Sequence, residues 1–356
     1  MESREGGTVE IDGSYGEGGG QILRTALALS AILGKGFTIH HIRSNRKNPG
    51  LQAQHLEAAE ALARITDAHT EGIKFGSQRI SFFPHKILPG DYQLEVRTAG
   101  SVTLLLQAVF LPLCLSHGAS KLTLTGGTHV PWSPPFHYFS EVLLPTLKRM
   151  GISADATIEE WGWYPRGGGK IQVRINPVRE LEPISLLERG PLKKIRGLSV
   201  VSKLPKHIAD RQKEHALKRI QKELKMDAEI KTFYDVPSKG PGSFVFLVIE
   251  YENVLAGFSS LGSRGKSAER VADDAIDGLK DYFGSESCID PHLADQLVPF
   301  MALTKGNSSF TTAPMTEHLL TNLWVLQHFL EVRILRWGEK GNRGRVEFLN
   351  EYKSLT

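Results

Sequence analysis

The stretch DGSYGEGGGQ (residues 12–21) decides the first part of the fold, because it joins an alternating segment to a helical one. Residues 8–12 alternate in the manner of a short strand, and residues 21–33 carry apolar side chains at helical spacing. Consecutive glycines at a helix start expose backbone N–H groups, where the helix dipole favours an anion. Glu17 is then placed to hold Mg²⁺ over phosphates. A plain tight turn explains the same spacing, and the stretch matches neither GxGxxG nor a P-loop.

Strands and helices continue to alternate outward from this stretch, which predicts an α/β (α+β) architecture with helices packed on sheets. The same order of strands and helices recurs along the chain, although the residue identities recur only weakly. The predicted strands are 37–42, 80–83, 92–96, 121–125, 152–158 and 170–175, and the predicted helices are 52–65, 102–113, 136–150, 293–303 and 318–332.

Residues 186–283 interrupt this series and read as a separate unit of strand, long helix, strand, strand and helix. A βαββα unit of about 100 residues is large enough to hold its own small core. The sequence therefore predicts a large domain of repeated units at 1–185 and 284–340. It also predicts a small inserted domain at 186–283 and a C-terminal tail at 341–356.

The composition is that of an average water-soluble protein, with 40% apolar and 23% charged residues. A net charge of +4 permits an anionic partner without demanding one. Cys114 and Cys288 show no CxxC spacing, which argues against a disulfide framework or a cysteine zinc site. The N-terminus lacks a signal pattern, and the longest apolar run is too short to cross a bilayer. We therefore expect a cytoplasmic location without membrane association.

Two further stretches place polar groups at predicted helix starts. In the first, IRSNRKNPGLQAQH (residues 42–55), Arg43 and Arg46 can fork around phosphate oxygens, although a solvated charged turn is the ordinary reading of such a run. The second is RTAGS (residues 97–101), followed by Gln107 inside an apolar helix. A satisfied core amide is the simpler explanation of Gln107.

The second half of the chain adds three stretches. GWYPRGGGK (residues 162–170) permits close backbone approach, and by itself it indicates a structural turn. HLADQ (residues 292–296) precedes an apolar helix. In TEHLLTN (residues 316–322), Thr316 is a candidate N-cap, which puts His318 in the first helical turn. The dipole there disfavours protonation and leaves a neutral, nucleophilic imidazole. Most histidines have no such role, and this chain has 13.

Together, these six pieces resemble the RNA 3′-terminal phosphate cyclase family, in the family's order and from about residue 9 to residue 330. The resemblance rests on EGGGQxxR, RxxR with PGLxxQH, TAGS with its downstream glutamine, GxxPxGGG, HLADQ and HLLTN. It implies a large domain of repeated strand–helix units, like that of enolpyruvyl transferases, with a smaller inserted domain.

The resemblance also implies an ATP-dependent reaction with Mg²⁺ or Mn²⁺. ATP adenylylates an enzyme histidine, AMP passes to the 3′-phosphate of RNA, and the adjacent 2′-hydroxyl closes a 2′,3′-cyclic phosphate. His318 matches the nucleophile and Glu17 the metal-binding carboxylate. The matching phosphate-pocket residues are Arg24, Arg43, Arg46, Gln54 and His55, and the matching nucleotide contacts are Gln107, His292, Leu293, Ala294, Asp295, Gln296, Pro134 and Tyr138.

Two positions depart from the family's pattern. Trp161 stands where Arg or His is common, and Tyr138 stands where some relatives have Phe. The alternatives are a non-catalytic relative acting in ribosome assembly, an enolpyruvyl transferase-like enzyme and a plain RNA-binding protein. The histidine at 318 argues against the first, and the modest charge gives the last little support. The sequence is compatible with a homodimer.

Overall fold

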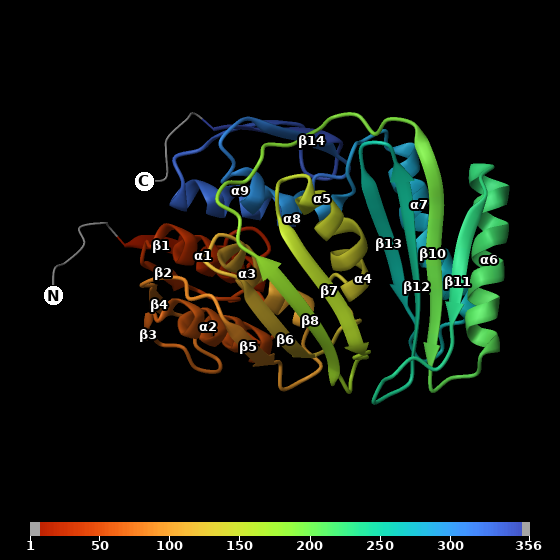
Figure 1. The fold of residues 1–356 in the computed structure, drawn as a ribbon, viewed down its shortest axis with the longest axis horizontal. Helices are drawn as coiled ribbons and strands as arrows, with labels where there is room; N and C mark the ends of the chain where they lie inside the picture. The colour runs from red at the N-terminus through yellow and green to blue at the C-terminus, as the bar shows by residue number, and fades with distance from the viewer. Residues whose placement is uncertain (1–7, 351–356) are drawn as a thin grey trace.

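The computed structural model describes residues 8–350 and contains three copies of one βαβαββ unit (Figure 1). In each copy the first two strands pair in parallel and the other pairings are antiparallel. The first copy has the sheet order β1-β2-β4-β3. It consists of β1 (Val9–Asp12), α1 (Gly20–Leu33), β2 (Phe37–His40), α2 (Ala53–Thr66), β3 (His69–Glu71) and β4 (Ile80–Phe83).

The second copy repeats that order as β5-β6-β8-β7. Its second helix is replaced by two α-helical pieces joined through a π-turn. The elements are β5 (Asp91–Glu95), α3 (Val102–Cys114), β6 (Ser120–Gly126), α4 (Phe136–Tyr138), η1 (Phe139–Leu143), α5 (Leu144–Lys148), β7 (Ser153–Glu160) and β8 (Gly169–Asn176).

The third copy has the same order, β9-β14-β16-β15, and is split in sequence. Its elements are β9 (Ser185–Leu186), α8 (Pro291–Met301), β14 (Ser308–Thr312), α9 (Glu317–Phe329), β15 (Arg333–Trp337) and β16 (Gly344–Leu349). The predicted mixed architecture of repeated strand–helix units is therefore confirmed.

A fourth sheet, of order β11-β10-β12-β13, is inserted between β9 and α8. It lies to the right in Figure 1, with α6 and α7 packed against each other and against its strands. Its elements are β10 (Leu192–Ser202), α6 (His207–Leu224), β11 (Ala228–Phe233), β12 (Gly242–Tyr251), β13 (Leu255–Leu261) and α7 (Ala268–Gly284). The predicted βαββα order was short by one strand, because a tight turn of three residues joins β12 to β13 and hides the boundary.

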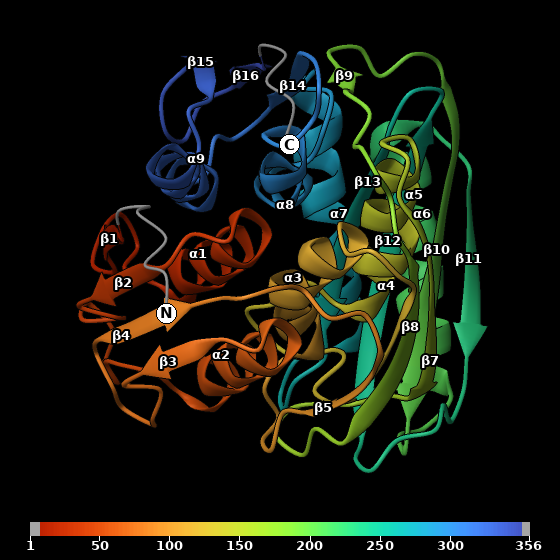
Figure 2. The ribbon, with the colours of Figure 1, turned by 60° about the vertical axis from the view of Figure 1, so that its left-hand side comes forward.

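The helices of the three copies pack against one another and form a central layer between the sheets (Figure 2). Strand β6 alternates strictly between buried and half-buried residues, so only one of its faces turns toward the helices. Burial of the apolar helix and strand faces is the main stabilising contribution. Cys114 and Cys288 are buried and free. No described helix has the length and apolar character that a bilayer crossing requires.

The predicted C-terminal tail at 341–356 is wrong for residues 344–349. These residues form β16, which lies between β14 and β15 and completes the third sheet. Val346 and Phe348 are fully buried. The alternation of so short a strand is obscured by the glycine-rich segment that leads into it, with Gly338, Gly341 and Gly344. The last six residues, 351–356, lie outside the described part of the chain. The boundaries of the large and inserted domains stay predictions.

We expect Phe348→Ala to lower the free energy of unfolding by about 3–5 kcal/mol, because a fully buried ring is replaced by a cavity. Arg345→Ala, on the exposed face of the same strand, is the control and should change it by less than about 1 kcal/mol. Urea unfolding measures both. An unchanged midpoint for Phe348→Ala would mean that this segment is a dispensable tail.

Candidate active site

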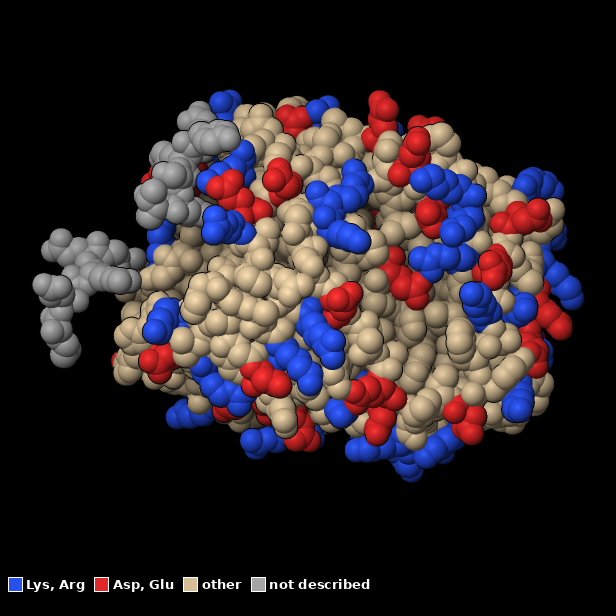
Figure 3. Space-filling model, viewed as in Figure 1, with Lys and Arg blue, Asp and Glu red and all other residues tan. Residues whose placement is uncertain are grey.

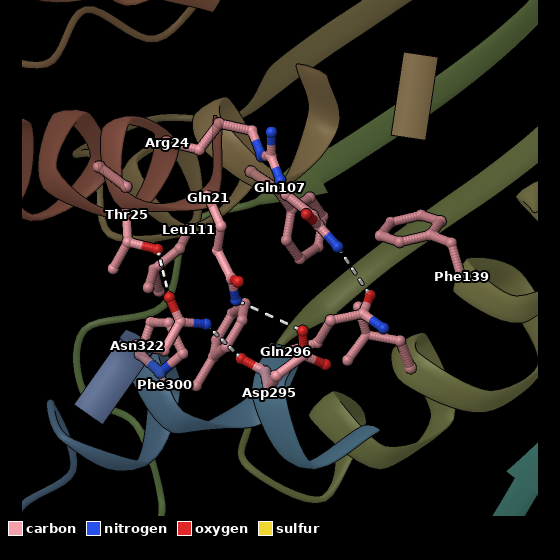
Figure 4. A pocket seen from close by; sticks show the side chains of 14 residues that line it. Gln21, Arg24, Thr25, Gln107, Leu111, Phe139, Asp295, Gln296, Phe300 and Asn322 are labelled. Atoms are coloured by element: carbon pink, nitrogen blue, oxygen red, sulfur yellow. Dashed lines mark hydrogen bonds between the residues drawn. The ribbon is translucent and has the colours of Figure 1, made fainter. Parts of the chain in front are cut away.

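Helices from all three repeats deliver polar side chains to one pocket of about 60 Å³ (Figure 4). The polar lining comes from α1, α3, α8 and α9, whereas the opposite side is apolar. The polar residues are Gln21, Arg24, Thr25, Gln107, Asp295, Gln296 and Asn322, and the apolar side includes Phe110, Phe139 and Phe300. The structure thus brings together Arg24, Gln107, Asp295 and Gln296 of the predicted residues, from three distant parts of the chain.

A chain of hydrogen bonds fixes the His318 imidazole. The Asp295 carboxylate accepts a bond of 3.4 Å from the Gln21 amide nitrogen, which turns the Gln21 amide oxygen toward Nδ1 of His318. An amide oxygen only accepts, so Nδ1 carries the proton and donates to it. The other ring nitrogen, Nε2, therefore keeps its lone pair. It lies 3.4 Å from a carboxylate oxygen of Glu17.

The environment of His318 favours the neutral ring. Thr316 caps α9 as predicted, through its hydroxyl and the Leu319 N–H. Burial lowers the pKa of His318; Glu17 opposes this, and the nearby Arg24, His292 and Arg46 lower the pKa further. The side chain remains about half exposed, at 47%, so a substrate can reach it.

The glycine loop before α1 seats Glu17 beside His318. Gly16 and Gly18 have φ of +56°, in the left-handed region that favours glycine. A Cβ at Gly16 would come within 2.5 Å of the Thr321 hydroxyl on α9, so the loop lies directly on that helix. Glu17 also pairs with Arg46 at 3.0 Å. Glu17, Arg46 and His318 therefore form one cluster, as predicted.

Arg24 lies deep beside this cluster. Its Nε is buried and has no hydrogen-bond partner. Burial lowers its pKa to about 10, against the attraction of Asp295, so the guanidinium stays charged at neutral pH. Burial and the neighbouring Asp290 raise the pKa of Asp295 to about 8, opposed by Arg24. A buried cation with an unused donor is suited to binding an anion.

His55 lies under the start of α1. A Cβ at Gly20 would fall 2.0 Å from His55 Nε2 and 3.1 Å from an Arg24 nitrogen, so only glycine fits there. His55 Nδ1 accepts the Gln52 N–H at 3.3 Å. Burial, helped by Arg24 and Arg43, lowers the pKa of His55 to about 3, so this ring stays neutral. No side chain caps α1, which leaves its first N–H groups facing the cluster.

Four predicted residues make contacts away from the pocket. The Arg43 guanidinium donates to the carbonyls of Asn48 and Gly50, so it braces its own loop. Gln54 accepts the Ser101 N–H at 3.4 Å. The Pro134 carbonyl accepts from Thr103. Tyr138 is only 3% exposed.

The Tyr138 hydroxyl donates to both carboxylate oxygens of Asp290, at 2.8 and 3.0 Å. Asp290 is the N-cap of α8 and also accepts a bond from the Gly257 N–H of β13. In the segment 292–296, His292 is exposed, Leu293 and Ala294 are core residues, and Asp295 and Gln296 line the pocket. Leu293 and Ala294 thus anchor the helix that presents Asp295 and Gln296 to the pocket, and His292 lies near His318.

Sequence reasoning missed Gln21 and Asn322 as site residues. The Asn322 amide accepts from Thr25 at 2.7 Å and donates to the Asp295 carbonyl at 2.7 Å, which joins α9 to α1 and α8. Both residues stand inside stretches already singled out, EGGGQ and HLLTN, so their signal was present. Only the spatial arrangement shows that Gln21 bonds to the predicted nucleophile.

A divalent metal has one carboxylate available in this cluster. Within residues 8–350, no group of three or more His, Cys, Asp or Glu side chains is arranged to hold a metal ion. Mg²⁺ is usually bound by one or two carboxylates together with water and substrate phosphates. Glu17 fits that pattern, and the buried guanidinium of Arg24 lies nearby.

A family model described as RNA 3′-terminal phosphate cyclase matches residues 15–335. The chain belongs to the RNA 3′-terminal phosphate cyclase family. It is 42% identical to the RNA 3′-terminal phosphate cyclase of Methanopyrus kandleri over 95% of this chain and 98% of that protein. The cyclase of Thermococcus onnurineus is likewise 42% identical, over 95% and 98%. The resemblance noted from the motifs is confirmed, and with it the enzyme class and an RNA substrate.

Solved enolpyruvyl transferases resemble this cyclase only distantly. The enolpyruvyl transferase NikO of Streptomyces tendae is 11% identical, with a TM-score of 0.39. The match covers 96% of this chain and 48% of that one, so this chain spans about half of that structure. On the face seen in Figure 3, basic and acidic side chains are interspersed, in keeping with the net charge of +4. The cytoplasmic location stays a prediction, and the sequence does not fix the oligomeric state.

We expect Asp295→Asn to stabilise the cyclase by an amount that increases as the pH rises from about 4 to about 8. The folded pKa of Asp295, about 8, lies above its ordinary value of 3.8, so the native carboxyl destabilises the fold progressively as pH rises between these values. At about pH 8 the free energy of unfolding of the variant should exceed that of the wild type by about 2 kcal/mol, allowing for solvent screening. Near pH 4 the two should be almost equal. Urea unfolding across this range measures the gain. A pH-independent difference would contradict the raised pKa.

Proposed function

We propose that this cyclase uses ATP and forms a covalent adenylate on Nε2 of His318. The observation that carries the proposal is the unpartnered, buried guanidinium nitrogen of Arg24 beside a neutral imidazole with a free lone pair. A positive donor set next to a nucleophile is what attack on a nucleotide phosphorus requires, because charge develops on the leaving group. The uncapped start of α1 adds N–H donors to the same place.

In the first step, Nε2 attacks the α-phosphorus of ATP. A P–N bond forms, the bond from the α-phosphorus to the bridging oxygen breaks, and pyrophosphate leaves with both bonding electrons. The ring becomes cationic, and the Gln21 oxygen at Nδ1–H stabilises that charge. Gln21 thus both positions the nucleophile and favours the transition state.

In the second step, an oxygen of the RNA 3′-phosphate attacks the same phosphorus and the P–N bond breaks. The imidazole leaves as a neutral ring with its proton still on Nδ1, so no further proton is needed. In the third step, the 2′-hydroxyl attacks the 3′-phosphorus, AMP departs, and the hydroxyl proton passes to solvent. Holding that hydroxyl in line is the main requirement, since the reaction is intramolecular.

The nucleotide would bind at the pocket between the three repeats, which at about 60 Å³ would hold only part of it. Gln107 and Gln296, joined by a bond of 3.1 Å, and Asp295 would face the adenosine part, against the apolar wall. Tyr138 and Pro134 would serve the adenine side indirectly. Tyr138 holds Asp290 at the start of α8, and the Pro134 carbonyl holds Thr103 at the start of α3. Arg24 and Arg46 would bind phosphates. Glu17 would hold Mg²⁺, which when bound neutralises charge on the leaving pyrophosphate.

We expect His318→Ala to abolish labelling of the protein by α-³²P-ATP. The bond should be acid-labile and alkali-stable, as for a phosphoramidate. His328→Ala, in the last turn of the same helix and exposed, is the matched control and should label like the wild type. Labelling that persists in His318→Ala would show that another residue is the nucleophile. A wild type that never labels, yet cyclises RNA, would rule out the covalent route.

We expect Gln21→Leu to slow adenylylation by about 10- to 100-fold, because the acceptor that fixes the imidazole is lost. Gln21→Glu keeps an acceptor and should restore part of the rate. Its carboxylate favours the charged imidazole and raises the His318 pKa, so the pH profile of labelling should move to higher pH. Equal rates and profiles for all three proteins would show that Gln21 only fills space.

A further inference from the structure

Two stretches with no part in the chemistry above, TAGS (98–101) and GWYPRGGG (162–169), meet at a second, open groove of about 690 Å³. The groove lies at the lower end of the second sheet as drawn in Figure 1. At this end β6 and β7 stop and β8 begins. Gly167, at φ +60°, brings the two stretches together. A Cβ there would come within 2.9 Å of the Ala99 Cα.

Two aromatic side chains of this groove face solvent. Trp132 is 98% exposed and Tyr164 is 67% exposed. Trp132 also has φ of +66°, a conformation that is unfavourable for a bulky residue. Strain and full exposure at one tryptophan point to a ligand that uses the ring, since neither stabilises the fold.

The groove begins next to the catalytic cluster. Gln54 lines the groove and accepts the Ser101 N–H. The next residue, His55, lies under Gly20 at the start of α1, beside Arg24. Gln54 and His55 are consecutive residues of α2, so the groove and the proposed phosphate site border the start of the same helix. An RNA chain that presents its end to His318 would pass by this helix start into the groove.

Cations adjoin the two stretches that form the groove, either next to them in sequence or in contact with them. Arg97 directly precedes TAGS and is 82% exposed, although it is also 3.5 Å from Glu57. Arg166 follows Tyr164 and Pro165, and both it and Lys203 donate to the Lys239 carbonyl. The Lys239 side chain in turn lies against Gly168. Exposed aromatic rings bordered by cations are the usual means of binding single-stranded nucleic acid without regard to sequence.

We propose that this groove binds the unpaired nucleotides next to the 3′ end of the RNA, whose bases stack on Trp132 and Tyr164. The proposal rests on the proposed function for the place of the terminal phosphate. We choose RNA as the ligand because the chain belongs to the RNA 3′-terminal phosphate cyclase family. The RNA would contact the two rings, the neighbouring cations and the proposed phosphate site.

The test is the affinity of variants for a short 3′-phosphorylated oligoribonucleotide and for the same oligonucleotide with abasic residues near its 3′ end. We expect Trp132→Gly and Tyr164→Ala each to weaken binding of the normal RNA by about tenfold. Binding of the abasic RNA should be weak for the wild type and unchanged by either substitution. Phe233→Ala, an exposed aromatic on β11 in the inserted sheet, is the control and should bind both like the wild type.

Two further measurements separate the outcomes. Trp132→Gly removes strain, because glycine accepts φ of +66°, so its thermal unfolding should not fall below that of the wild type. Labelling by α-³²P-ATP without RNA should be normal in both variants. If the wild type does not label while the variants lose RNA affinity, only the covalent mechanism fails. Unchanged affinity in both variants, or equal losses with normal and abasic RNA, would overturn the stacking groove.

Discussion

The hydrogen bond between His318 and Gln21 is the constraint on which the site depends. It decides which ring nitrogen carries the proton, and it works only because Asp295 holds the Gln21 amide in one orientation. Each of the three residues comes from a different helix, α9, α1 and α8. The tautomer of a single imidazole is therefore set by the packing of three helices that belong to two repeats.

The repeated βαβαββ unit explains how so few residues assemble a site. In each copy, helices begin near the same end of the copy's sheet, and copies that pack around a common centre bring these beginnings together. Because the copies carry different polar residues on these helices, the pocket has the Gln107 amide, the Arg24 cation and the Asp295 carboxyl on separate walls. A single unit of this kind has only one such wall.

Much of the fold was readable from the sequence because long helices and alternating strands leave strong periodic signals. The short strands β9, β15 and β16 leave almost none, and β16 was mistaken for a tail until its neighbours in the sheet were seen. The motifs located His318, Glu17, Arg24 and Arg46 correctly within one cluster. Motifs do not reveal direction, so they gave no sign that the Arg43 guanidinium turns back into its own loop.

The N-cap of α8 gives the inserted sheet a mechanical connection to the pocket. The buried Asp290 carboxylate is held by the Tyr138 hydroxyl and also by a backbone N–H of β13. A rigid-body shift of the insert would pull on that carboxylate and tilt the helix whose next turn carries Asp295 and Gln296. A remote sheet can thus change the width of the pocket between the three repeats without contacting it.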